Sequence, residues 1–544
     1  MMGWYNAPMQ LPRRTLLSFI AIAVLAGSFF FVRLGSNPLE KWDEAIHAQV
    51  THEMLQSGNW LELTWNHEPY FRKPPLRFWL QGVVSAAFGE NEWTIRFWSA
   101  TAGVLTTLLI ALWAWQATSK TTAMWFTTLA FLSGRYLFYH AFRTGETDGL
   151  LTFFTLLALW SYWRSWLKPR WLLLTAIALG LTFLTKFTAV GFAGAAILVH
   201  LLLTKRFRAY PWKIWLQALG LGLLIVAPWI IAQLAIRGGA FIQEYVSEDV
   251  VTRASKNLYG FTAGPDWYWG VFLKRAFPMV AFVFPALVWA AWRAVKKRDQ
   301  LQLLFLLFTA VTAVILSFNA SKIDWYLLPI YPVVMMVTGL WMTRWFRWPV
   351  GWFTMGLVVW GTVMASWGIF TYARQQAQTF AATHTGTWVN PIATLGSWNP
   401  TKGKVLTALV IGLVSIAAVY VAKKYNKHRL WYVYCAVVLL GMLAVTTISL
   451  RTEFTQPRGE PLLRETRTII QREKPATLYL ANIYLAHEPT VLYYLGNESG
   501  TKLEKAPATI PSGSWVLEKQ QRGYVPIDGR EILTSPDFRL IQEL

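Results

Sequence analysis

Charged side chains are scarce in this chain. Of its 544 residues, 14% are Asp, Glu, Lys or Arg, whereas 55% are apolar and 16% are aromatic. Soluble domains carry about 25% charged residues, so this composition excludes an ordinary soluble globular protein. Apolar stretches of spanning length recur as far as about residue 450 and then stop. The sequence therefore predicts a polytopic α-helical membrane protein with a soluble tail.

Three further features are missing. The chain has a single cysteine, Cys435, which excludes an internal disulfide and a thiol-ligated metal site. It has no glycine-rich phosphate loop. We find no internal repeat, whereas a transporter built from inverted repeats often shows two matched halves with broken helices.

Positive charge is abundant, with a formal net charge of +22. The basic residues cluster between apolar runs, which is the positive-inside pattern of cytoplasmic loops. A nucleic-acid-binding protein would gather them on one soluble face, so no nucleic-acid partner is expected. The clusters lie at 13–14, 164–170, 205–213, 293–298, 344–347 and 423–429.

Spans of roughly 17–25 apolar residues predict about thirteen membrane helices. They lie at 15–34, 94–116, 122–139, 149–166, 171–187, 188–204, 214–234, 268–292, 301–318, 326–343, 350–370, 403–422 and 430–450. The run 76–88 is too short to span and is predicted to be interfacial. With it left out, every basic cluster falls inside, together with only Asp299 of the 28 acidic residues. Segments 35–93 and 235–267 then form outer loops, and the N-terminus is cytoplasmic.

The chain divides into a transmembrane unit, 1–450, and an outer tail, 451–544. Short apolar runs typical of β-strands occur in the tail, after a helix-like stretch at 462–473. The runs are 476–482, 489–496 and 513–519. A small α/β domain is predicted there.

An acidic pair, Asp43 and Glu44, follows the first span. In a helix Asp43 and His47 share one face. A carboxylate here either takes a proton from an acceptor hydroxyl or holds a cation against a phosphate. The alternative is a solvated interfacial helix whose acidic residues favour the helix dipole. A divalent metal held by Asp43, Glu44 and His47 is left open, although the spacing matches no tight metal signature.

The segment Tyr70–Leu76 lies in the same predicted outer loop. Two prolines follow Lys73, fix the backbone and remove two amide donors, so the ammonium is held rigidly. A compact ammonium suits a phosphate, although a snorkelling lysine at the headgroup level is a common alternative.

Further charges fall on the same predicted face. Asp148 lies at a helix start, where it either caps the helix or serves a site, and Arg143 either pairs with it or grips an oxyanion. Lys186 and Lys322 lie on the outer rim, where the positive-inside rule disfavours lysine, so at least one is expected to bind phosphate.

Several motifs follow one another in order: Asp43-Glu44, Gly58-Asn59-Trp60, Tyr70 to Leu76 with Trp79, Gly89-x-x-x-Trp93-x-x-Arg96, Arg143 with Asp148, Gly180 to Lys186, and Lys322-x-x-x-Tyr326-Leu327-x-Pro329. As a set they resemble the bacterial polyprenyl-phosphate-sugar glycosyltransferases, which include the lipid A aminoarabinose transferases and relatives of the protein O-mannosyltransferases. The resemblance covers about residues 30–335 and implies the type C glycosyltransferase fold.

The resemblance implies an inverting sugar transfer from a polyprenyl (undecaprenyl) phosphate donor at the outer leaflet, with no nucleotide and no required cofactor. Asp43, Glu44 and Asp148 would be the catalytic acids. The residues that would bind the donor phosphate are Tyr70, Lys73, Arg143, Lys186, Lys322 and Tyr326. The protein would be a monomer among the lipids of a bacterial inner membrane, with its active site and tail in the periplasm.

The chain departs from the family pattern at two places, so the resemblance does not fix the sugar or the acceptor. Ile46-His47 stand where the family usually has Arg-Tyr, and Phe187-Thr188 stand where Gly-Pro usually follows the lysine. A lipid A phosphate acceptor is already ionised, and Asp43 would then position it or a cation. A hydroxyl acceptor would need Asp43 as a base.

The main prediction is transfer to lipid A or another cell-envelope glycolipid, and protein O-glycosylation from the same donor is its alternative. A transporter or flippase for a lipid-linked substrate would carry ionisable residues at mid-bilayer, whereas these spans are nearly free of charge. A non-catalytic scaffold would not need a rigid Lys-Pro-Pro beside an acidic pair.

Overall fold

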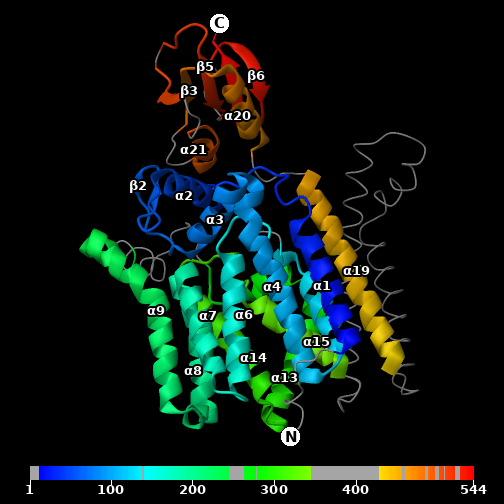
Figure 1. The fold of residues 1–544 in the computed structure, drawn as a ribbon. Helices are drawn as coiled ribbons and strands as arrows, with labels where there is room; N and C mark the ends of the chain where they lie inside the picture. Colours follow the sequence, from blue (N-terminus) through cyan, green and yellow to red (C-terminus); the bar gives the residue numbers. More distant parts are fainter. Residues whose placement is uncertain are drawn as a thin grey trace, which may run out of the picture.

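The computed structural model describes most of the chain. The described residues are 12–137, 140–243, 245, 263–276, 279–344, 428–455, 460–483, 488–496, 501–507, 509–520 and 527–543. They form a helical bundle, a layer of short elements at one end of it, and an α/β tail beyond that layer (Figure 1). We refer to the end of the bundle that faces the tail as the tail-side end.

The bundle is built from long apolar helices. They are α1 (Arg13–Phe31), α4 (Glu92–Thr118), α5 (Thr121–Leu132), α6 (Asp148–Ser165), α7 (Trp171–Thr185), α8 (Val190–Thr204), α9 (Trp212–Arg237), α12 (Trp267–Arg275), α13 (Val280–Lys296), α14 (Gln300–Phe318), α15 (Ile330–Arg344) and α19 (His428–Thr455). Large aromatic residues fill the interior. The ring of Trp113 lies 5.8 Å from that of Trp163 and 5.0 Å from that of Phe305, between ring centroids.

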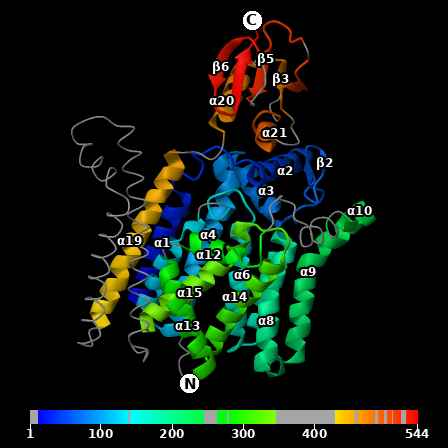
Figure 2. The same cartoon turned by 180° about the vertical axis from the view of Figure 1, so that it is seen from behind.

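Five helices of the described residues are long and apolar enough to cross a membrane: Arg13–Phe31, Glu92–Thr118, Phe187–Thr204, Trp212–Arg237 and Gln300–Phe318. Helix α9 leaves much apolar surface uncovered, with Leu219 61% and Leu224 69% exposed. Such surface is expected on a helix that faces lipid. In Figure 2, α9 stands at the side of the bundle and continues into the short α10 (Gly239–Phe241).

The predicted spans agree with most of these helices. The predicted span 268–292 differs, because it falls on two elements, α12 and α13. The spans expected at 350–370 and 403–422 lie outside the described residues, as does most of the loop 235–267. The count of about thirteen spans therefore stays a prediction.

The layer at the tail-side end contains α2 (Asp43–Ser57), α3 (Leu76–Phe88) and a two-stranded ribbon of β1 (Thr64–Trp65) and β2 (Glu68–Pro69). Helix α3 is the short run that was predicted to be interfacial, and it lies beside α2 above the bundle (Figure 1). Helix α2 is polar in sequence yet mostly buried, so most of its polar groups need partners within the fold. Glu53 shows how, because its carboxylate accepts hydrogen bonds from Thr64 Oγ1 and the backbone of Asn66.

The tail is an α/β unit with a five-stranded sheet in the order β4-β3-β5-β7-β6. Its elements are α20 (Pro461–Glu473), β3 (Thr477–Ala481), α21 (Pro489–Leu495), β4 (Lys502–Lys505), β5 (Trp515–Lys519), β6 (Arg530–Thr534) and β7 (Phe538–Gln542). Strand β3 is parallel to β4 and β5, whereas β7 is antiparallel to β5 and β6.

One predicted strand of the tail is wrong. The run 489–496 is mostly helix α21, which begins with Pro489 at its first position, where a missing amide hydrogen costs nothing. All seven residues of α21 are buried. Burial on every side, between α20 and α2, explains why the run is uniformly apolar without being a strand.

The tail is joined to the layer by polar contacts as well as by apolar packing. Arg464 Nε donates to Glu92 Oε1 at 2.8 Å, and the Tyr494 hydroxyl donates to the same oxygen at 2.8 Å. The Tyr494 oxygen in turn accepts from the backbone amide of Leu39 at 2.9 Å. Leu39 and Ala48 pack in one apolar cluster with tail residues. The tail therefore supports the segment that leads into α2.

We expect Tyr494→Phe to lower the free energy of unfolding by about 1–3 kcal/mol, because it leaves the buried Leu39 amide without its acceptor. Thermal unfolding of the detergent-solubilised protein checks this. Tyr479→Phe is the matched control, since it removes a hydroxyl for which no hydrogen bond is described in the same domain. Equal midpoints for the two variants would contradict the assigned contact.

Candidate active site

Helix α2 begins at a strained residue. Trp42 has φ +72° and ψ −122°, a region that costs a non-glycine residue about 1–3 kcal/mol and is often found at functional sites. Asp43 and Glu44 occupy the first turn, where carboxylates are favoured by the helix dipole. The helix ends at Ser57 and is followed by Gly58, which takes the left-handed conformation with φ +69°.

Both carboxylate oxygens of Glu44 are bound by Arg96 in an internal ion pair. Its Oε1 accepts from Arg96 Nε at 2.7 Å and its Oε2 from Arg96 Nη2 at 2.8 Å, and it is fully buried. Burial alone would raise the pKa of Glu44, but the Arg96 charge lowers it. Arg96 also donates to the carbonyls of Leu34, Asn37 and Pro38. Glu44, expected as a catalytic acid, therefore serves to position α2 on α4.

The loop 140–147 is held against the same helix. Glu44 Oε1 accepts from the amide of Gly145, where a Cβ atom would come within 2.7 Å of Ile95 and 2.9 Å of Glu44. Arg77 of α3 donates to the carbonyl of Glu146 at 3.0 Å. Only glycine fits at position 145, and the loop is fixed from two sides.

Glu146 lies between two histidines. Its Oε2 is 3.7 Å from His47 Nδ1 and its Oε1 is 3.2 Å from His140 Nδ1. Burial and the charge of Arg77 lower the pKa of His47 to about 3, so the ring is neutral. Burial alone would lower the pKa of His140, but the Glu146 charge raises it to about 9. The ring of His140 stacks on Trp325 at 3.8 Å, which brings loop 319–329 to the site.

Asp43 is partly exposed on the face of α2 that carries His47. Burial alone would raise the pKa of this carboxyl, but the nearby positive charges, of which Lys73 is the strongest, together lower the pKa of Asp43 far below its usual value. His140 and Lys186 act in the same direction. Asp43 is therefore ionised among cationic groups, and Lys73 is near enough to act on it most strongly.

Asp148 and Lys186 form a buried pair at the helix ends beside this group. Lys186 Nζ donates to Asp148 Oδ1 at 2.9 Å and lies 4.1 Å from the centroid of the Tyr326 ring. Three of the predicted site residues thus meet one another here, as an ion pair covered by an aromatic ring.

The remaining predicted site residues make contacts that hold parts of the fold together. Arg143 donates to the carbonyls of Phe29, Phe30 and Val32 and so ties down the end of α1. Lys322 Nζ donates to the carbonyls of Leu316 and Ser317 at the end of α14. Tyr70 packs edge-to-face on Phe78, with ring centroids 5.8 Å apart. A role for any of them in binding phosphate stays a prediction.

Among the described residues, Asp43, His47 and Glu146 each offer one ligand atom, and the three atoms lie within 4.8 Å of one another. The set left open from the sequence was Asp43, Glu44 and His47. Glu146 replaces Glu44, because both oxygens of Glu44 are bound by Arg96.

Sequence reasoning missed the buried residues that support the site from inside the fold. Arg77 and Arg96 are buried and donate to main-chain or carboxylate groups far away in the sequence, and the buried Glu146 lies against His47 and His140. Arg96 lies in one of the quoted motifs, and a charge at the start of an apolar span is the signal that identifies it.

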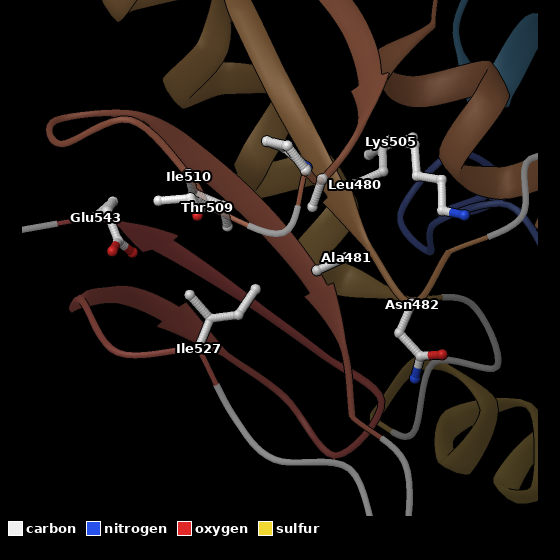
Figure 3. Close-up of a pocket in the computed structure, with 10 residues that line it drawn as sticks. Leu480, Ala481, Asn482, Lys505, Thr509, Ile510, Ile527 and Glu543 are labelled. Carbon is white, nitrogen blue, oxygen red and sulfur yellow. The ribbon is translucent and has the colours of Figure 1, made fainter.

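A cavity of about 520 Å³ lies in the tail, at the carboxyl ends of β3 and β4. Figure 3 shows Lys505, Asn482 and Glu543 around it, with Ile510 and Ile527. None of the predicted site residues lines this cavity. The charged cluster around Asp43, and not this cavity, is the candidate active site.

Comparison with known proteins shows what the chain as a whole is similar to. A family model described as dolichyl-phosphate-mannose-protein mannosyltransferase matches residues 72–231. A crystal structure of ArnT from Cupriavidus metallidurans bound to undecaprenyl phosphate superposes with a TM-score of 0.69 at 18% identity and covers 98% of each chain. The chain is similar to the ArnT-like and mannosyltransferase-like type C glycosyltransferases, and it shares the fold of the solved ArnT structure. These similarities confirm the resemblance and the membrane glycosyltransferase fold, whereas the predicted number of spans stays a prediction.

Two curated relatives show how far the sequence similarity extends. An uncharacterized protein of Aquifex aeolicus is 29% identical over 60% of this chain and 63% of its own length. An undecaprenyl phosphate-alpha-4-amino-4-deoxy-L-arabinose arabinosyl transferase of Erwinia tasmaniensis is 26% identical over 56% of this chain and 55% of its own length. The chain thus aligns with less than two thirds of the length of either relative, and its activity and substrates are matters for proposal.

Proposed function

We propose that this protein transfers a sugar from a polyprenyl phosphate donor to a cell-envelope glycolipid of the lipid A type, at the outer face of a bacterial inner membrane. The observation that carries the proposal is the gathering of Asp43, His47 and Glu146 within 4.8 Å of one another at the tail-side end of the bundle, where the charge of Lys73 helps to lower the pKa of Asp43. The names of the relatives, which include an arabinosyl transferase and an undecaprenyl-phosphate-bound ArnT, support the donor class.

The proposed reaction needs positive charge near the departing phosphate. The bond between the anomeric carbon and the donor phosphate oxygen breaks, its electron pair stays on that oxygen, and a bond forms from the acceptor oxygen to the anomeric carbon. Fixed cations near the departing phosphate stabilise the developing charge, and they act strongly where water is scarce. Lys73 is the cation that acts most strongly on Asp43, and the Lys186–Asp148 pair lies beside it.

In this proposal Asp43 acts on the acceptor. A lipid A phosphate is already ionised and attacks without a base, so Asp43 holds either the acceptor or a cation in place. A hydroxyl acceptor gives up its proton to Asp43, which is a weak base because its pKa is lowered. The lowered basicity favours the ionised acceptor, and this is the reason for preferring a lipid A phosphate to a serine or threonine hydroxyl.

The test uses the purified full chain in lipid nanodiscs. Labelled undecaprenyl-phosphate sugars are offered with lipid A, with a Ser/Thr-rich peptide, or with no acceptor, and the label is followed by mass spectrometry. We expect label on lipid A, with the anomeric configuration inverted in the product. Label on the peptide alone would replace the acceptor assignment, and absence of transfer from every donor would overturn the proposal.

Lys73→Met adds a residue-level check. Loss of one group that stabilises the developing charge lowers the rate by roughly 100-fold or more. Lys120→Met is the matched control, because Lys120 lies beyond the other end of α4, at the start of α5. Equal transfer rates for the two variants would remove Lys73 from the phosphate site.

A further inference from the structure

Positive charge gathers at the end of the bundle opposite the tail, on two neighbouring segments. The segment 166–170 joins α6 to α7, and the segment 205–213 leads from α8 into α9 (Figure 1). The sequence has no aspartate or glutamate between Asp148 and Glu244, so neither segment brings a counter-ion of its own. We call the six basic side chains of these segments the basic surface: Lys168, Arg170, Lys205, Arg206, Arg208 and Lys213.

Contacts between polar and aromatic side chains hold the two segments side by side. Ser165 Oγ lies 2.8 Å from the Tyr210 hydroxyl, and the guanidinium carbon of Arg206 lies 4.4 Å from the centroid of the Trp166 ring. The Trp166 ring in turn stacks on His200, with centroids 5.1 Å apart. Arg206 is half-buried, whereas the other five members are exposed. The basic surface is therefore one surface, with one guanidinium held on an indole ring.

The basic surface has no carboxylate partner in the part of the chain that the structure describes. None of its members forms an ion pair there. Asp299, which precedes α14 at the same end of the bundle, pairs with Arg293 at 2.8 Å and caps α14, so it is already bound. Six like charges on one surface repel one another, and an anion among them relieves this repulsion.

Exposed apolar side chains lie directly beside these charges. Leu203 precedes Lys205 by two residues, and Trp212 and Leu216 lie on the first turns of α9. A water-soluble anionic partner would leave this apolar surface uncovered. A phospholipid satisfies both parts, because its headgroup carries the phosphate and its acyl chains cover apolar helix surface.

We propose that the basic surface binds the headgroup of an anionic phospholipid, whose acyl chains lie along α8 and α9. Clusters of lysine and arginine next to membrane helices attract lipids of net negative charge. A zwitterionic headgroup such as phosphocholine brings its own cation, so it neutralises the basic surface poorly. The inference goes beyond the proposed sugar transfer and is independent of it, because Asp43 lies at the tail-side end of the bundle.

Lipid binding is measured on the purified, delipidated full chain in a neutral detergent, with no sugar donor or acceptor. Phosphatidylglycerol and phosphatidylcholine are offered in equal amounts, and native mass spectrometry counts the lipids that stay bound. We expect phosphatidylglycerol to be preferred at least about 10-fold. We expect Lys168→Gln and Lys213→Gln, one from each segment, each to weaken its binding roughly 5-fold. Added salt should weaken the binding as well, since exposed charges are screened.

Lys502→Gln is the matched control, because it removes the same charge from an exposed lysine of the tail. This variant should bind phosphatidylglycerol like the parent protein, and thermal unfolding shows whether all variants are folded. Equal binding of the two lipids, or Lys168→Gln and Lys213→Gln that both bind like Lys502→Gln, would overturn the inference. Displacement of the lipid by millimolar inorganic phosphate would also overturn it, because the basic surface would then take a soluble anion. Loss of sugar transfer in any variant would have no bearing on it.

Discussion

Replacing Asp43 with Asn is expected to lower sugar transfer by roughly 100-fold or more while the protein stays folded. Asn keeps the shape of the side chain but removes the negative charge that faces Lys73 and His140. Whether Asp43 holds a cation, holds the acceptor or takes a proton, each role needs the carboxylate. Initial rates of label transfer in nanodiscs measure the loss, and the thermal midpoint measures folding.

Glu68→Gln is the control for this variant. Glu68 lies in the same segment, on β2, and is exposed, so its loss should leave the rate unchanged. Donor binding, followed with the labelled undecaprenyl-phosphate sugar, should survive in Asp43→Asn, because Lys73 and Lys186 remain. A transfer rate in Asp43→Asn equal to that of Glu68→Gln would show that Asp43 has no part in the reaction.

The membrane helices could be predicted because each satisfies its own backbone hydrogen bonds, so hydropathy and length suffice. The predicted span 301–318 and helix α14 differ by one residue. The pairing of Asp43 with His47 was also accessible, since residues four apart share a helix face. The rigid Lys73 and the early acidic pair were found from chemistry alone, and the structure brings Lys73 within electrostatic range of Asp43.

The sequence does not show which of Asp43 and Glu44 faces the site and which one faces the bundle. Neighbours on a helix point about 100° apart, so one of the two must face the bundle, but only the position of Arg96 shows which one does. The position of Glu146 in the site could not be predicted for a similar reason, because its contacts with His47 and His140 depend on how one loop crosses α2. Helix α21 was taken for a strand because a short apolar run has no decisive period.

Glu44→Gln is expected to lower the free energy of unfolding by about 3–5 kcal/mol, because it leaves the charge of Arg96 buried without its counter-ion. The pair is bidentate and closed from solvent, with side-chain exposures of 5% for Arg96 and 0% for Glu44. The same variant also removes the negative charge from the oxygen that accepts the hydrogen bond of the Gly145 amide. Thermal and denaturant unfolding in detergent measure the change.

Glu473→Gln provides the contrast, since Glu473 pairs with Arg472 on the surface of the tail, where an ion pair contributes at most about 1 kcal/mol. The double variant Glu44→Gln/Arg96→Met separates the ion pair from other effects of Glu44. If the ion pair is the cause, Arg96→Met lowers the free energy of unfolding less in the Glu44→Gln background than in the parent protein, because the pair is already broken there. Additive losses, or a loss in Glu44→Gln no larger than in Glu473→Gln, would mean that α2 is held by its apolar contacts. Glu44 would then be available for the role in catalysis that the buried pair denies it.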